Sequence, residues 1–138
     1  IPIAKARPRF FRRGKFVGTY NQQTTEEGRL RLDIARQLPD SWEPIQKPVR
    51  IICRFYMKRP KNHYGTGKNS KTLKPSAPLF HTSKPDIDNL QKTVYDCCNQ
   101  IVWMDDACVI ESASRKEYSE NPRTEIIIKV IADGQKES

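Results

Sequence analysis

The sequence predicts a small α+β domain in which a mixed or antiparallel sheet packs against two main helices. Two segments repeat apolar residues in steps of three and four, as one face of an amphipathic helix does. Other segments are rich in β-branched and aromatic residues and are bounded by proline or glycine, which is typical of strands. A chain of 138 residues is long enough for one core, and we expect a single domain over residues 1–138.

The first half of the chain predicts a hairpin, a helix and a strand. The stretch FFRR-G-KFVGTY places a glycine between two aromatic segments, which predicts an irregular or hairpin structure. Apolar residues recur at helical spacing within residues 22–38, from Leu30 to Leu38, and Pro39 ends that helix. Residues 48–58, PVRIICRFYMK, predict a strand because they are β-branched and aromatic.

A long basic loop is expected at residues 59–83, where prolines and glycines are scattered among polar residues. Loops of this length are usually functional or disordered. His63 and His81 lie in it without a cysteine or histidine at metal-ligand spacing, so we expect solvated or DNA-contacting side chains. Residues 133–138 form a polar tail.

The second half predicts one helix and two strands. The helix covers residues 88–101, with one apolar face. Strands follow at 109–118 and 124–131, and the Asn121–Pro122 turn between them predicts an antiparallel hairpin. The run IIIKVI in the last strand predicts a buried central strand.

The charges are segregated. The net charge is +9, yet residues 5–15 and 44–85 contain no acidic residue at all. Such basic stretches are the electrostatic footprint of a nucleic-acid-binding protein. A solubilising basic surface is the alternative that composition alone leaves open.

The four cysteines form no CxxC pair and predict neither a disulfide framework nor a zinc site. We expect them to be small buried apolar side chains in a reducing cytoplasm. No apolar stretch reaches the ~20 residues of a membrane-spanning helix, so no membrane association is expected.

Five of the eight aspartates lie between Asp86 and Asp106, within the basic chain. An extended segment ending at Asp86 and Asp88 would turn both carboxylates to one side, at the positive end of the following helix. Asp105 and Asp106 come after that helix, and spacing does not decide whether they return to its start. If they do, three carboxylates form the oxygen-ligand set that Mg²⁺ prefers. Alternatively, Asp88 is an N-cap and the aspartate pair a turn.

The acidic motifs resemble the RusA family of Holliday junction resolvases, in its phage-type form. The resemblance rests on KPDIDNLQK at residues 84–92, the following helix, and WMDDA at residues 103–107, and it extends to Val109. It implies a small dimeric endonuclease that cuts four-way DNA junctions by paired symmetric nicks in recombination and repair. It also implies a Mg²⁺ cofactor, for which Mn²⁺ can substitute. The protein would act in the bacterial cytoplasm and would be encoded by the bacterium or by a phage.

Carried over by position, the resemblance implies a catalytic role for Asp86, Asp88, Asp106 and Lys92. The first three would bind the metal together with Asp105. Lys92 lies four residues after Asp88 on the same helix face, where it could hold a phosphate oxygen.

Phosphate contacts are expected from the basic segments. The predicted DNA-binding residues are Arg7, Arg9, Arg12, Arg13, Lys15, Lys58, Arg59 and Lys84. A non-catalytic DNA-binding module, or a nuclease for other branched DNA or RNA, stays open as an alternative.

Overall fold

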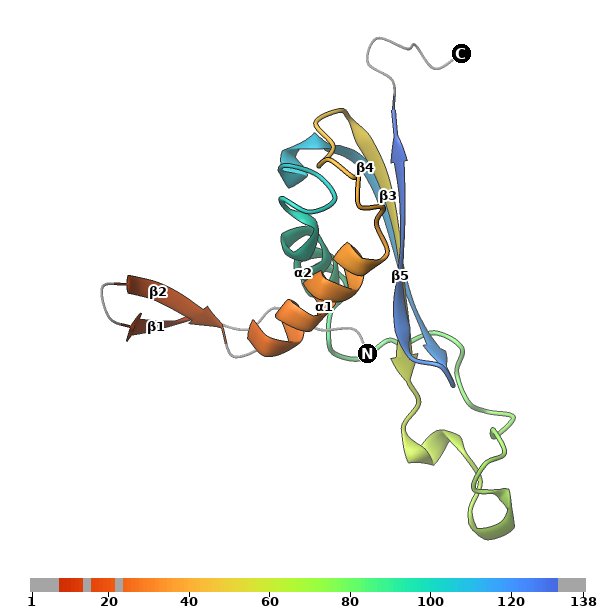
Figure 1. Cartoon of the computed structure of the whole chain (residues 1–138). Coiled ribbons are helices and arrows are strands. Elements are labelled where there is room, and N and C mark those ends of the chain that lie inside the picture. Colours follow the sequence, from red (N-terminus) through yellow and green to blue (C-terminus); the bar gives the residue numbers. More distant parts are fainter. Residues whose placement is uncertain (1–7, 14–15, 22–23, 132–138) are drawn as a thin grey trace.

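The structure is a computed structural model that describes residues 8–13, 16–21 and 24–131, with side chains from Glu26 onward. The elements follow in the order β1 (Pro8–Arg13), β2 (Phe16–Asn21), α1 (Thr24–Arg36), β3 (Val49–Lys58), α2 (Ile87–Cys98), β4 (Val109–Ser119) and β5 (Arg123–Val130). Both helices lie on the same face of a three-stranded sheet (Figure 1). The α+β prediction is confirmed.

The hairpin, the first helix and the first long strand match their predictions closely. β1 and β2 pair in antiparallel register, with Arg13 opposite Phe16. The second helix begins near its predicted start but ends at Cys98, before the predicted end at Ile101. It ends there because Asn99 leaves the helical conformation with ψ 130 and Gln100 takes a positive φ of 66.

The strand order is β4-β3-β5, so β3 is central. β3 is parallel to β4 and antiparallel to β5. The predicted hairpin of the last two strands is therefore wrong, because β3 lies between them. The prediction of a central IIIKVI strand is also wrong, because β5 is an edge strand and Ile127 is 46% exposed. Alternate residues of a strand point to opposite faces, so consecutive isoleucines cannot all face the helices.

The core lies between β3 and the helices. Alternate side chains of β3 are buried, from Val49 to Met57, and they pack against α2 and the loop that follows it. Trp103, in that loop, is fully buried. Arg31 of α1 donates to the main-chain oxygen of Asp96 at 3.0 Å, so a positive charge lies at the carboxyl end of α2, where the helix dipole favours it.

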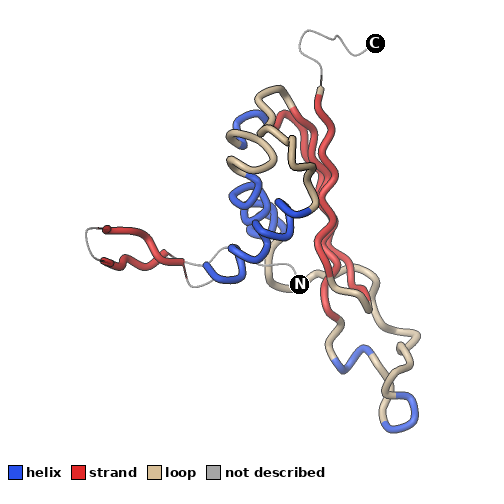
Figure 2. The backbone as a smooth tube through the Cα atoms, viewed as in Figure 1, coloured by secondary structure: helices blue, strands red, loops and turns tan. Residues whose placement is uncertain are grey.

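Residues 59–83 form an arm that extends beyond the end of the sheet (Figure 2). Its two legs pair at Tyr64 and Leu73, and two 3-10 turns, Lys61–His63 and Gly67–Asn69, shape it. The returning leg pairs with the end of β4 through Phe80 and Glu117. This long loop therefore has defined turns and pairing between its legs. Within the described ranges, the helices are too short or too polar to cross a bilayer.

Candidate metal and nucleic-acid site

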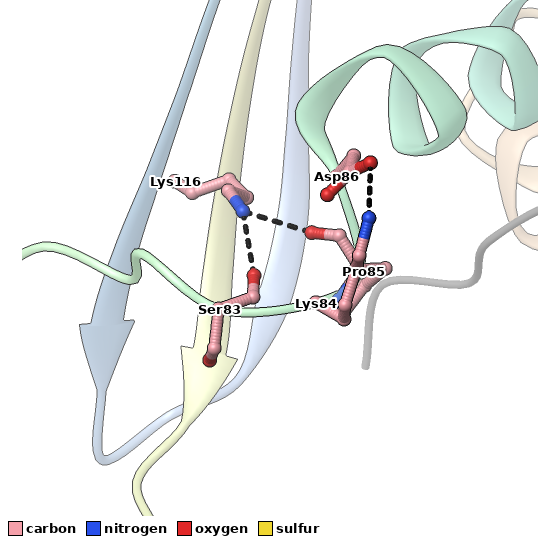
Figure 3. A network of polar contacts seen from close by, with 5 residues as sticks. All are labelled: Ser83, Lys84, Pro85, Asp86 and Lys116. Atoms are coloured by element: carbon pink, nitrogen blue, oxygen red, sulfur yellow. Dashed lines mark hydrogen bonds and ion pairs between the residues drawn. The ribbon is translucent and has the colours of Figure 1, made fainter.

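Asp86 immediately precedes α2 and has an extended backbone, with φ −71 and ψ 150. An aspartate at this position usually caps the helix by accepting from its free N–H groups. Asp86 makes no such bond; its carboxylate instead accepts from Lys84 Nζ at 2.7 Å (Figure 3). That hydrogen bond is the main cause that lowers the pKa of Asp86, so the carboxylate stays ionised.

Asp88 lies in the first turn of α2 and is exposed. The N-cap position belongs to Asp86, so Asp88 is not the cap that the alternative interpretation assumed. Two carboxylates thus flank the positive end of the helix dipole. Lys92 is one turn further along α2 and is also exposed.

Lys116 of β4 fixes the segment that leads into α2. Its Nζ donates to the main-chain oxygens of Ser83 at 2.9 Å and Pro85 at 2.8 Å (Figure 3). These carbonyls lie on either side of Lys84, which pairs with Asp86. The role of Lys116 could not be predicted from the sequence, because no local pattern links it to a segment 31 residues earlier.

Asp106 lies at the other end of α2. It begins the short 3-10 turn Asp106–Cys108, and its Oδ2 accepts from Asn99 Nδ2 at 3.4 Å. Asn99 follows the last residue of the helix. Asp105 is exposed and extended, with φ −150 and ψ 144.

The structure therefore does not bring all the predicted acids together within one chain. α2 has 12 residues, and at ~1.5 Å per residue it separates Asp86 from Asp106 by roughly 18 Å. The part of the chain that the structure describes contains no group of three or more residues able to hold a metal ion. Asp86 and Asp88 form one acidic pair, and Asp105 and Asp106 form another.

The predicted DNA-binding residues have different surroundings. Lys58 and Lys84 are exposed. Arg59 donates to the main-chain oxygen of Pro78 at 2.7 Å and lies 5.3 Å from the ring centroid of Tyr118, so it also anchors the arm. Arg7 and Lys15 lie outside the described residues, as do the side chains of Arg9, Arg12 and Arg13.

The base of the arm is a cluster of rings around Tyr118. The rings of His63 and His81 meet Tyr118 edge-on, with centroids 4.6 and 5.1 Å away. His81 is 8% exposed, and its Nδ1 has no hydrogen-bond partner among the described residues. The expectation of a solvated or DNA-contacting His81 is therefore wrong, because the returning leg of the arm pairs with β4 and buries the ring.

Three of the four cysteines are buried, as predicted, and Cys108 is half-buried. The four are free thiols. Burial raises the pKa of Cys53 to about 11 and that of Cys98 to about 12, which keeps both protonated at neutral pH.

A groove of about 1080 Å³ lies between α1 and β5, lined in part by Leu30, Trp42 and Ile126. None of the predicted acids lines it. Of the acids at the two ends of α2, Asp88 and Asp105 are exposed and Asp86 and Asp106 are half-buried.

These features define a small α+β protein with acidic residues at both ends of α2 and a protruding basic arm. Residues 1–129 match the family described as Endodeoxyribonuclease RusA. The chain belongs to this endodeoxyribonuclease family, as its motifs indicated.

One relative is the Uncharacterized protein YqaN of Bacillus subtilis (strain 168), which is 34% identical over 88 residues. The match covers 64% of this chain and 61% of the relative, so the chain spans about three fifths of that protein's length. No solved structure matches the chain.

Proposed function

We propose that the protein is a Mg²⁺-dependent endodeoxyribonuclease that resolves four-way DNA junctions in recombination and repair. Membership of an endodeoxyribonuclease family supports the activity. The main support for the site is the geometry at the start of α2. The Asp86 side chain does not cap the helix and is ionised, and the neighbouring Asp88 is exposed. The branched substrate follows from the family.

The acidic pair fits the proposed metal. Mg²⁺ takes hard oxygen ligands and is often held by one or two carboxylates together with substrate phosphates. Asp86 and Asp88 would hold it, and when bound it supplies positive charge that stabilises the charge developing on phosphate oxygens. Lys92, exposed one turn after Asp88, would donate to a phosphate oxygen of the bound strand.

The separation of the two acidic pairs supports a homodimer with shared sites. In a two-fold dimer each contact occurs twice, so α2 of one copy can place its start beside the end of α2 in the other. Asp106 would then complete the site formed by Asp86 and Asp88 of the partner subunit. Two such sites, related by the two-fold axis, would make the paired symmetric nicks that junction resolution requires.

The basic arm supports DNA binding. It contains Lys61, Lys68, Lys71 and Lys74, all of which are exposed, and their charges would contact phosphates. The backbone pairing of its returning leg with β4 fixes the arm relative to the start of α2. The arm would therefore position the DNA relative to the acids.

The direct test is incubation with a labelled four-way junction and with linear duplex of the same sequence, each with Mg²⁺ and with EDTA. We expect paired nicks in the junction only, and only with Mg²⁺. Tight junction binding without cleavage would instead favour the non-catalytic DNA-binding module. Cleavage of other branched DNA or of RNA at an equal rate would overturn the junction selectivity.

A further inference from the structure

We propose that Asn99 is a positioning residue for Asp106. The buried indole of Trp103 fixes the orientation of the Asn99 amide, so that its nitrogen faces Asp106. The proposal rests on the proposed function, because it concerns how one of the nuclease acids is held. Asn99 is not part of the acidic motif. It lies where α2 gives way to the turn that carries Asp106.

The orientation of the Asn99 amide follows from hydrogen-bond chemistry. An asparagine side chain has one end that accepts and one that donates, and the indole N–H of tryptophan can only donate. Trp103 Nε1 donates to Asn99 Oδ1 at 2.6 Å, and Trp103 is fully buried. The oxygen of the amide is therefore committed to the indole, and Nδ2 must face away from it.

Asn99 Nδ2 faces Asp106, whose Oδ2 is 3.4 Å away. A donor in this place limits the rotamers open to the Asp106 carboxylate. It also distinguishes the two neighbouring acids, because Asp105 is exposed and has no hydrogen bond to Asn99. Asn99 therefore orients the half-buried Asp106 and not Asp105.

The backbone of Asn99 is fixed as well. Its N–H donates to the Tyr95 oxygen at 3.1 Å, and its carbonyl accepts from Arg31 at 3.4 Å. The Tyr95 ring meets the Trp103 ring edge-on, with centroids 5.6 Å apart. Every polar group of Asn99 is therefore engaged, which is the arrangement expected of a residue that holds another in place.

The test is the substitution Asn99→Asp, which distinguishes the donor role of the amide nitrogen from the acceptor role of the amide oxygen. The aspartate keeps an oxygen for the Trp103 indole but replaces the donor to Asp106 by a second carboxylate oxygen. We expect a folded protein by circular dichroism, junction binding in EDTA no tighter than that of the wild type, and a cleavage rate at saturating Mg²⁺ that is lower by roughly tenfold to a hundredfold. Mn²⁺ affinity, measured by calorimetry on the dimer without DNA, should fall.

Trp103→Phe provides the matched second variant. It keeps Asn99 but removes the donor that fixes the amide, so the cleavage rate should fall although no polar group near Asp106 has changed. Wild-type cleavage and Mn²⁺ affinity in Asn99→Asp would overturn the proposal, since Asn99 would then serve only as an acceptor for the indole. Tighter Mn²⁺ binding with retained cleavage would overturn it too. If the wild-type protein itself does not cleave, the proposed function fails, whereas a fall in Mn²⁺ affinity still supports the role of Asn99.

Discussion

Lys116 donates to the main-chain oxygen of Pro85 at 2.8 Å, and this contact ties the edge strand β4 to the segment that carries Asp86. The same ammonium also bonds Ser83. One side chain of β4 therefore holds the backbone on both sides of Lys84, leaving the Lys84 side chain directed at Asp86.

Replacing Lys116 by methionine should loosen the start of α2. Two hydrogen bonds from a charged donor at a partly exposed place are worth about 1–2 kcal/mol together. We expect a loss of that size in the free energy of unfolding, measured by urea denaturation, and slower junction cleavage. Lys129→Met, at an exposed position of β5, is the control and should change neither. Equal behaviour of the two variants would contradict the role of Lys116.

Neutralising the predicted metal ligands should abolish cleavage without weakening DNA binding. Asp86→Asn, Asp88→Asn and Asp106→Asn each remove a charged ligand, so each should lower the rate by orders of magnitude. Asp96→Asn should be much milder, since Asp96 is not part of either acidic pair. Binding isotherms in EDTA should show junction affinity equal to or above that of the wild type, because the variants repel phosphates less.

Mixing two inactive variants tests the shared site. If each site combines Asp88 of one copy with Asp106 of the other, a heterodimer of Asp88→Asn and Asp106→Asn subunits contains one intact site and one doubly substituted site. Refolding the two variants together should then restore nicking of one strand, though not paired cleavage. Sites formed within one chain predict no restored activity, and a denaturing gel of the labelled junction distinguishes the outcomes.

The free energy of unfolding should decrease as the pH falls below 6.5, because His81 binds a proton less readily in the folded protein than in the unfolded chain. Burial, and then the charge of Lys116, lower the pKa of His81 below its usual 6.5, so the folded protein favours the neutral ring. Below pH 6.5 the unfolded chain binds more protons than the folded one, and the free energy of unfolding decreases until the folded pKa is passed. Arg59 and His63 also face Tyr118, the ring against which His81 packs.

The measurement is urea unfolding from pH 5 to pH 8 for the wild type and for His81→Phe. The phenylalanine keeps a ring against Tyr118 but cannot bind a proton, so the part of the decrease due to His81 should vanish. An equally steep decrease in the variant would assign the effect to other groups.

The buried thiols should be inert while the protein is folded. With the pKa of Cys53 at about 11 and that of Cys98 at about 12, almost no thiolate forms at pH 8. Cys108 is half-buried and its pKa is raised as well, chiefly by burial, so it should react slowly and before the others. A thiol-reactive dye should label Cys108→Ser only after denaturant is added. Rapid labelling of the folded variant would mean that the core around β3 opens readily.

Local patterns in the sequence predicted the elements well, because hydrophobic periodicity and turn residues act over short distances. β3 alternates as its sequence indicates, and α2 begins at the motif that resembled a nuclease site. The pairing of β3 with both β4 and β5 could not be predicted, since it joins residues far apart along the chain. For the same reason the sequence named Asp86 and Asp106 as candidates but did not reveal that one helix holds them apart.

The central place of β3 also affects how the chain can fold while it is being made. Val49 pairs with Val109 on one side and with Val130 on the other, so both neighbours of β3 are synthesised after the whole arm and α2. At ~5–20 residues per second, the apolar strand leaves the ribosome roughly 3–10 s before it can be paired on either edge. During that time both edges of β3 are unpaired and can form hydrogen bonds with another nascent chain.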